Sequence, residues 1–243
     1  MGASLPLAAI PGVQAGEAHR LERVGLQLYT VRDLMQTNVP ATLEQVARVG
    51  YKEVEFAGYF GTPPVRLRRW LDDLGLTAPA AHVSLLDGDL NRMLDEAAEL
   101  GHGYLIQASL PLVQQRSLDA FRRAAASLNR AGEEARSRGV AVGYNNHDFE
   151  FRPSGGIIPY DVLLAETDPE LVWMEVDVYW MAKADRDPVR YFAAHPPAVP
   201  PVPSQGHRPA REHHGCGPGP DRFLGHPPSA GPGRAASLLR RAR

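Results

Sequence analysis

The feature that most constrains the fold of this chain is a regular alternation of short apolar runs and helical patterns. It extends from Val24 to about residue 196. The apolar runs are separated by segments of roughly ten to twenty residues with helical periodicity, which is typical of β/α units around a parallel sheet. The expected strands are residues 24–29, 53–56, 78–84, 104–108, 140–145 and 172–177. The expected helices are residues 42–49, 65–74, 90–100, 117–138 and 160–166, with a sixth starting near Asp187.

Six consecutive units with short connections fit either a (β/α)8 barrel or a doubly wound sheet. A doubly wound nucleotide-binding sheet carries a glycine-rich phosphate loop after its first strand. Here residues 27–32 read Gln-Leu-Tyr-Thr-Val-Arg, without glycine. We therefore expect an α/β fold, a (β/α)8 TIM barrel that is incomplete, with about six β/α units in residues 22–196 and then an irregular tail. In such a barrel, functional groups gather at the C-terminal ends of the strands.

Composition excludes several classes of partner. The hydrophobic content of 44% supports a sizeable core. Residues 197–243 hold seven Arg against Glu212 and Asp221, so the formal net charge of -2 leaves residues 1–196 at -7, which disfavours a nucleic-acid partner. The single cysteine, Cys216, excludes a disulfide framework. No stretch approaches the roughly 20 apolar residues of a membrane span.

Residues 1–21 are expected to be a leader outside the barrel. Their small and apolar residues resemble the end of an export signal, but no basic segment precedes them. The leader is either the remnant of a longer export signal or a plain extension. The localisation therefore stays open between cytoplasmic and exported.

Polar and ionisable side chains recur at the expected strand ends. They are Gln27, Tyr29, Glu55, His82, Gln107, His147, Asp148, Glu150, Asp177 and Trp180. Any one such residue is more often a hydrogen-bonded rim residue than a functional group. Because all six strand ends carry them, and parallel strands in a barrel end at one mouth, we expect a common site there.

Two segments carry a resemblance to a known family. Residues 143–153 read Gly-Tyr-Asn-Asn-His-Asp-Phe-Glu-Phe-Arg-Pro, and residues 171–181 read Leu-Val-Trp-Met-Glu-Val-Asp-Val-Tyr-Trp-Met. Here the chain resembles the xylose isomerase-like family of sugar phosphate isomerases and epimerases, in the branch whose fifth strand ends in Tyr-His-Asn-His-Asp-Phe-Glu-Phe. Residues 24–32, 50–55 and 167–172 provide supporting matches. The resemblance covers about residues 22–196.

The resemblance implies a divalent metal at the mouth of the barrel, held by Glu, Asp, His and a second Glu from strands five to eight. Glu150 then corresponds to the first ligand and Asp177 to the second. Mn²⁺, Mg²⁺ or Co²⁺ would polarise a sugar carbonyl while acid/base groups move the proton. The catalytic residues that the resemblance implies are Glu150, His147 and His82. The implied substrate-binding residues are Gln27, Tyr29, Glu55, Gln107, Asn145 and Trp180.

One position departs from the family pattern, because Asn145 stands where relatives have His. An Asn side chain donates and accepts hydrogen bonds but does not titrate near neutral pH. Either the substrate preference differs, or the His is not essential there.

Residues 197–243 do not continue the pattern. Of these 47 residues, 17 are Gly or Pro, and the sequence shows neither a strand nor a helix period. We therefore do not expect this segment to form strands seven and eight. When the reading frame is shifted by one base, with third bases chosen freely, residues 199–207 become Phe-Pro-Leu-Cys-His-Leu-Lys-Asp. Residues 216–226 and 234–243 likewise give sequences that end in Pro-Ile-Asp-Phe-Leu-Gly and Tyr-Phe-Val-Glu-His, and all three match what the family carries there, in order. We therefore expect a single-base slip near residues 196–199, natural or a sequencing error, that removes two of four metal ligands.

The expected function is a metal-dependent sugar or sugar phosphate isomerase or epimerase that transfers a proton on a small sugar or polyol. An alternative is an inactive truncated or sugar-binding product of that family, since the metal is expected to bind only when the frame is restored. A metal-dependent endonuclease of the same fold is disfavoured, because the ordered part is acidic and has no basic stripe. The sequence leaves the oligomeric state open.

Overall fold

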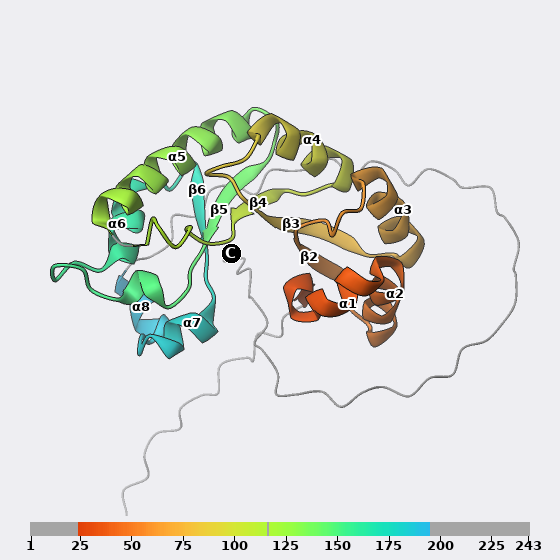
Figure 1. The fold of residues 1–243 in the computed structure, drawn as a ribbon, viewed down its shortest axis with the longest axis horizontal. Coiled ribbons are helices and arrows are strands. Elements are labelled where there is room, and N and C mark those ends of the chain that lie inside the picture. Colours follow the sequence, from red (N-terminus) through yellow and green to blue (C-terminus); the bar gives the residue numbers. More distant parts are fainter. Residues whose placement is uncertain (1–23, 116, 195–243) are drawn as a thin grey trace, which may run out of the picture.

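A computed structural model of the chain describes residues 24–115 and 117–194, and these form an open parallel sheet with helices on its outside (Figure 1). The strand order is β1-β2-β3-β4-β5-β6, so every strand pairs with the next one along the chain. The strands are β1 (Gly25–Gln27), β2 (Glu53–Ala57), β3 (Thr77–Val83), β4 (Tyr104–Gln107), β5 (Ala141–Asn145) and β6 (Val172–Glu175). The prediction of six consecutive β/α units is confirmed.

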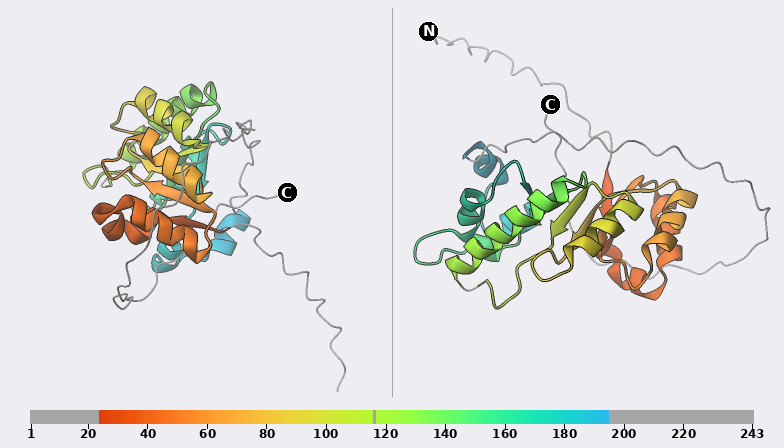
Figure 2. Two further views of the ribbon diagram at one scale, coloured as in Figure 1. Left: turned by 90° about the vertical axis from the view of Figure 1, so that its right-hand side faces the viewer. Right: turned by 90° about the horizontal axis from the view of Figure 1, so that it is seen from above.

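A helix follows each strand. The helices are α1 (Arg32–Thr37), α2 (Val39–Val49), α3 (Pro64–Leu74), α4 (Leu90–Leu100), α5 (Leu118–Arg136), α6 (Pro159–Glu166), α7 (Val178–Lys183) and α8 (Pro188–Ala194), with 3-10 turns η1 (Leu28–Val31) and η2 (Phe149–Phe151). Figures 1 and 2 show α3, α4, α5 and α6 along the convex side of the curved sheet, while the strands lie inside the arc. The concave side is therefore where the strand ends approach one another.

The core lies between the sheet and the inner faces of these helices. In α4, Leu94, Ala97 and Leu100 recur at helical spacing and are buried. Burying a side chain of the size of leucine contributes about 1.5–3 kcal/mol. Helices such as α4 thus bury an apolar face in the core, which explains why the sequence period predicted the elements.

Helix ends explain the short connections. Gly50, Gly75 and Gly101 close α2, α3 and α4 in left-handed conformations, with φ of 110°, 62° and 78°, where a side chain would be strained. Asn38 and Asp89 cap the starts of α2 and α4 through their side chains. The expected and observed ends of these three helices agree within a few residues.

Strands one and six are shorter than predicted. The chain leaves β1 at Gln27 and turns into η1, so Tyr29 lies outside the strand, and it leaves β6 at Glu175 before Asp177 caps α7. In both places most of the next four residues are apolar, β-branched or aromatic, so their pattern resembles a continuing strand. Both short helical elements lie at the C-terminal end of the sheet.

The sheet is not closed within the described residues, since β1 and β6 each have a strand partner on one side alone there. The predicted leader, residues 1–21, and the predicted out-of-frame tail, residues 197–243, lie outside the described residues. Across residues 24–115 and 117–194, none of the helices combines the length and apolar composition that a membrane crossing needs.

Candidate active site

Each strand carries a polar residue at or near its C-terminal end. These residues are Gln27, Glu55, His82, Gln107, Asn145 and Glu175. Glu55, Gln107, Asn145 and Glu175 are buried, at 7%, 3%, 4% and 4% exposure. Burial of this many polar side chains costs free energy unless they interact with one another or with a ligand. Their concentration at one end of the sheet therefore indicates a functional site.

Three of these side chains form a compact cluster, which we call the Glu55–His82–Glu175 cluster. His82 Nε2 lies 2.7 Å from Glu175 Oε2 and 3.6 Å from Glu55 Oε2. Gln27 Nε2 donates a hydrogen bond of 2.8 Å to the same oxygen of Glu55. The cluster thus joins residues from β1, β2, β3 and β6, which are far apart in the sequence but meet across the concave side.

Burial and neighbouring charges change the pKa values of Glu55 and His82 in the cluster. Burial, and then the charge of Glu175, raises the pKa of Glu55 to about 7. Burial alone would lower the pKa of His82, but its hydrogen bond to Glu175 and the charge of Glu55 raise it above the ordinary value. Two buried carboxylates around one imidazole therefore favour an additional positive charge between them, from a proton or a cation.

The same three side chains fit a divalent cation. Their ligand atoms all lie within 4.8 Å of one another. Glu55 Oε1 and Glu175 Oε1 are buried, and neither has a hydrogen-bond partner among the described residues. Carboxylate and imidazole donors suit Mn²⁺, Mg²⁺ or Co²⁺. The orphaned oxygens are what a cation would satisfy.

A second group lies beside the cluster, after β5 and β6. The rings of His147 and Trp180 are tilted, with centroids 5.1 Å apart. Asp177 accepts hydrogen bonds from the backbone N–H groups of Tyr179 and Trp180, and so fixes the start of α7. Burial lowers the pKa of His147, while the charge of Asp177 opposes this shift. The structure therefore brings His147, Asp177 and Trp180 together, while the roles that the resemblance implies for them stay predictions.

Glu150 is not a member of the Glu55–His82–Glu175 cluster. It is completely buried in η2, where Oε1 accepts a 2.6 Å hydrogen bond from the Tyr144 hydroxyl and Oε2 a 2.9 Å bond from the His147 backbone N–H. Burial raises its pKa to about 7. Neither Glu150 nor Asp177 belongs to a group of three ligand-type side chains in the described residues. Their role as metal ligands stays a prediction.

The other predicted substrate-binding residues differ in their exposure and in whether their side chains are already hydrogen-bonded. Gln107 is held by backbone, since its Oε1 accepts from the Leu86 N–H and its Nε2 donates to the Ser109 carbonyl. Tyr29 is half exposed at the rim, and the Arg32 guanidinium lies 4.4 Å above its ring. Asn145 is buried beside Glu175, its register partner on β6.

Sequence reasoning missed Glu175 and Asn146. Glu175 is a charged residue within an apolar strand, two positions before Asp177. Because side chains alternate between the two faces of a strand, residues two positions apart share a face, and this rule would have identified Glu175 together with Asp177. Asn146 ties two loops together, because its amide accepts from the Asp177 N–H and donates to the Asp177 carbonyl. No local signal distinguishes that long-range pairing in the sequence.

Taken together, the fold and the strand-end cluster define the first six units of a TIM barrel with acid/base groups and a candidate metal site at its C-terminal mouth. Solved structures with this fold include a sugar phosphate isomerase/epimerase and a xylose isomerase domain protein. The resemblance seen in the sequence is thus confirmed.

A sugar phosphate isomerase/epimerase from Parabacteroides distasonis shares 28% sequence identity with a TM-score of 0.65, over 73% of this chain and 76% of that chain. An AP endonuclease, family 2, from Brucella melitensis shares 16% identity with a TM-score of 0.55, over 72% and 75% of the two chains. The IolI protein with a bound zinc atom shares 12% identity with a TM-score of 0.52, over 68% and 66%. The last two similarities show the fold alone. No family model and no curated protein matches the sequence.

Proposed function

We propose that this chain is built as a divalent-metal-dependent isomerase or epimerase that moves a proton on a small sugar or polyol. The observation that carries the proposal is the Glu55–His82–Glu175 cluster, in which three ligand-type side chains converge at the C-terminal mouth of a barrel sheet. The similarity to a sugar phosphate isomerase/epimerase supports the reaction class. The IolI protein shares the fold and binds zinc, which is consistent with a metal ion in a barrel of this kind.

The chain's own residues supply the binding and proton-holding groups. Glu55, His82 and Glu175 would hold the cation, which when bound polarises a carbonyl and its neighbouring hydroxyl. Gln27 fixes the orientation of the Glu55 carboxylate through its amide hydrogen bond. His147, kept neutral near pH 7 because burial lowers its pKa, orients a substrate hydroxyl or accepts its proton. The indole of Trp180 gives the apolar face of a sugar ring a surface on which to pack.

Metal binding is tested by titrating the full chain with Mn²⁺ and measuring the free ion by electron paramagnetic resonance. Glu175→Gln should weaken binding at least about 10-fold, since it removes one anionic ligand. Glu170→Gln is the matched control, because that side chain is 77% exposed on the preceding loop. Equal Mn²⁺ affinity in the two variants would contradict the cluster as the metal site.

The reaction is tested by proton exchange in D₂O, followed by NMR over a panel of ketoses, aldoses and their phosphates. When the hydrogen on a carbon next to a carbonyl exchanges for deuterium, its ¹H signal is lost. This loss identifies the substrate even when the product has not been identified. Exchange should require added metal and should fall at least about 10-fold in Glu175→Gln. Metal binding with no exchange for any sugar would sink the catalytic part of the proposal.

A second candidate is an inactive or merely sugar-binding product of the same family. The observation that favours it is the open sheet, since no described residue pairs with the outer sides of β1 and β6. We propose that a single-base slip near residues 196–199 accounts for this, so that the restored frame supplies two further strands and two further metal ligands. Exchange by a frame-restored protein but not by the chain as written would establish this candidate for the present chain.

The gene itself tests the slip. Sequencing from the codons for residues 196–199 through those for residue 243 should reveal codons that read as the missing strands when shifted by one base. An unbroken frame with codons incompatible with those strands would remove the proposal. An endonuclease activity is not proposed, because the similarity to the AP endonuclease shows the fold alone and residues 1–196 are acidic.

A further inference from the structure

Asn146 joins the loop that follows β5 to the loop that follows β6. Its side chain is completely buried. The amide Oδ1 accepts a 3.0 Å hydrogen bond from the Asp177 backbone N–H, and Nδ2 donates a 3.2 Å bond to the Asp177 carbonyl. One side chain thus satisfies both polar groups of one backbone residue, as a neighbouring strand would. We call this pair of hydrogen bonds the Asn146 bridge.

The bridge begins where the strand pairing stops. Asn145, the last residue of β5, pairs in register with Glu175, the last residue of β6. Asn146 and Asp177 follow these two strand ends directly. Because the ladder of backbone hydrogen bonds has ended there, the two loops can separate unless another contact holds them. Glu175 itself is held by the ladder, so the bridge acts beyond the candidate metal site, on the start of α7.

Other polar contacts between α7, or the turn after it, and the loop after β5 are weaker. Lys183 Nζ lies 3.5 Å from the Asp148 carboxylate, and the Lys183 side chain is 48% exposed. Arg186 donates a hydrogen bond of 3.4 Å to the Phe151 carbonyl. Exposed ion pairs contribute little to stability, and a hydrogen bond of that length is weak. The Asn146 bridge is therefore the most deeply buried of these links in the described part of the chain.

The bridge fixes the residue from which α7 starts. While Asn146 holds the Asp177 backbone, the Asp177 carboxylate caps the helix, accepting from the N–H groups of Tyr179 and Trp180 at 2.9 and 3.2 Å. A helix of six residues gains little stability from its own hydrogen bonds, so its position depends on tertiary contacts. Met181 packs into the core, and the bridge holds the start of the helix. The bridge therefore helps to determine where the Trp180 indole lies.

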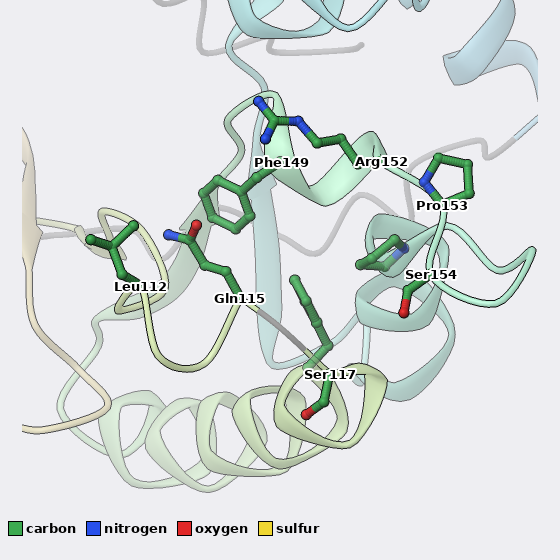
Figure 3. Close-up of a pocket in the computed structure, with 9 residues that line it drawn as sticks. Leu112, Gln115, Ser117, Phe149, Arg152, Pro153 and Ser154 are labelled. Carbon is green, nitrogen blue, oxygen red and sulfur yellow. The ribbon is translucent and has the colours of Figure 1, made fainter.

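The imidazole of His147, next to Trp180, is held by contacts outside α7. It stacks on Phe149 with centroids 5.8 Å apart and an interplanar angle of 23°. Phe149 and Gln115 line a cavity between the β5–α6 segment and the β4–α5 loop (Figure 3). The His147 backbone N–H donates to Glu150. Since the rings of His147 and Trp180 are 5.1 Å apart, a shift of α7 would move Trp180 relative to a fixed His147.

The pair of His147 and Trp180 borders the candidate metal site. Burial lowers the pKa of His147, and the nearby charge of His82 adds to this decrease. His82 belongs to the Glu55–His82–Glu175 cluster. The position of Trp180 beside His147 therefore bears on a substrate at that site.

From this geometry we infer that Asn146 is a positioning residue of the proposed reaction, which holds the Trp180 indole beside His147 so that a sugar ring can pack on it. The inference rests on the proposed function, in which Trp180 provides the apolar surface for the sugar, and it names the residue that sets this surface in place. Asn146 acts through Trp180 and not by contact with the substrate, because its amide is buried against the Asp177 backbone.

The chain contains a matched control, Asn129 in α5. Its Oδ1 accepts a 2.8 Å hydrogen bond from the Asp168 N–H, and its Nδ2 donates a 2.9 Å bond to the Glu166 carbonyl. This side chain also bridges backbone groups, but it does so before β6 begins, at the opposite end of the strand from the candidate site. A substitution that weakens either bridge costs stability, whereas substitution of Asn146 alone should change the candidate site.

The position of Trp180 is measured by fluorine NMR of the full chain labelled with fluorotryptophan. The chain has three tryptophans, and Trp180→Phe assigns the resonance. Asn146→Asp keeps the shape of the side chain but replaces the donor to the Asp177 carbonyl by an acceptor. It should shift or broaden the Trp180 resonance, whereas Asn129→Asp should leave it in place. Thermal melts show whether each variant is folded, and Asn146→Ala, which adds no charge, covers the case in which Asn146→Asp is not.

The effect on the reaction is measured by proton exchange with a sugar that the wild type accepts. Asn146→Asp should raise KM at least about 5-fold and leave kcat and Mn²⁺ affinity within about 3-fold, since the sugar loses a packing surface but no metal ligand changes. In a Trp180→Ala background the same substitution should no longer raise KM, because two changes that act through one group are not additive. Asn129→Asp should leave KM unchanged in both backgrounds.

Four results would overturn the inference. They are a Trp180 resonance that is the same in the wild type and in the Asn146 variants, an increase in KM that persists in full in the Trp180→Ala background, equal effects of Asn129→Asp, and a loss of Mn²⁺ affinity as large as in Glu175→Gln. The two proposals fail separately. If the wild type exchanges no sugar in the presence of Mn²⁺, the proposed function fails, and the fluorine spectra still decide whether Asn146 positions Trp180.

Discussion

Individual buried residues set how this protein responds to pH. His102 is fully buried, its Nδ1 lies 2.5 Å from the Ala78 carbonyl oxygen, and its ring stacks on Tyr59. Burial lowers its pKa to about 4, with a smaller opposing effect from the Ala78 carbonyl. The charged form of this residue is therefore accommodated in the unfolded chain but not in the folded one.

We expect His102 to destabilise the folded protein in acid. Between pH 6.5 and about 4 the unfolded state binds a proton that the native state does not, so the free energy of unfolding falls as the pH falls. The loss reaches up to about 3 kcal/mol near pH 4. His102→Asn retains a donor near Nδ1 and cannot titrate, so its urea midpoint should fall less between pH 7 and about pH 4.5. Equal falls in both proteins would show that His102 does not govern acid stability.

Glu150 distinguishes two roles for one carboxylate. Its two oxygens accept from the Tyr144 hydroxyl and the His147 backbone N–H, so in Glu150→Gln one of these donors loses an acceptor. We expect the free energy of unfolding to fall by about 1–3 kcal/mol, measured by urea denaturation. If Glu150 positions His147, Mn²⁺ affinity should stay within a few-fold of the wild type; if it is a metal ligand, as the resemblance implied, affinity should fall as in Glu175→Gln.

The candidate site was predictable from the sequence where a strand end falls within an unambiguous strand. Glu55 and His82 were found in this way, because β2 and β3 end near the expected positions. Glu175 was not, because the apolar pattern continued to Asp177 and hid the point where β6 stops. The side chains of Glu150 and Gln107 are held by hydrogen bonds to groups in turns and loops. The periodic patterns that predict strands and helices carry no information on such bonds.

At the scale of elements, the close approach of α5 to the chain before β6 depends on one glycine. A Cβ at Gly132 would lie 2.6 Å from the Leu171 carbonyl oxygen and 3.0 Å from Leu171 Cβ. Both neighbours are fixed, the oxygen by the backbone and Cβ by the short turn into β6. The helix and the turn are therefore packed against each other at the distance that only a glycine permits.

Gly132→Ala should destabilise the protein, although alanine favours helix. The gain in helix propensity is about 1 kcal/mol, whereas overpacking against a fixed backbone costs about 1–3 kcal/mol. Glu133→Ala, at the next position of the same helix and exposed, is the control and should be close to neutral. Chemical denaturation of both variants measures the difference, and a more stable Gly132→Ala would show that α5 shifts freely.

At the scale of the whole molecule, the open sheet predicts an uneven distribution of stability. β3 and β4 are paired on both sides, while β1 and β6 are paired on one side among the described residues. Amide groups on an unpaired edge exchange readily with solvent, and such edges invite association with other chains.

Hydrogen exchange followed by mass spectrometry should therefore show faster exchange in peptides covering Gly25–Gln27 and Val172–Glu175 than in those covering Tyr104–Gln107 and Ala141–Asn145. Frame restoration should slow the two edge peptides and leave the central ones unchanged. Uniform protection of all six strands in the chain as written would mean that the edges are covered.

The sequential strand order also has a consequence for how the protein is made. Since each strand pairs with its immediate successor, the strand pairing that one unit needs is available as soon as the next unit has been synthesised. Chains of this kind gain their structure progressively during translation, from the N-terminus onward. We therefore expect the strand pairs of the first units to have formed by the time a ribosome reaches the codons that follow residue 194. A change in the message at that point would then come too late to prevent the earlier units from folding.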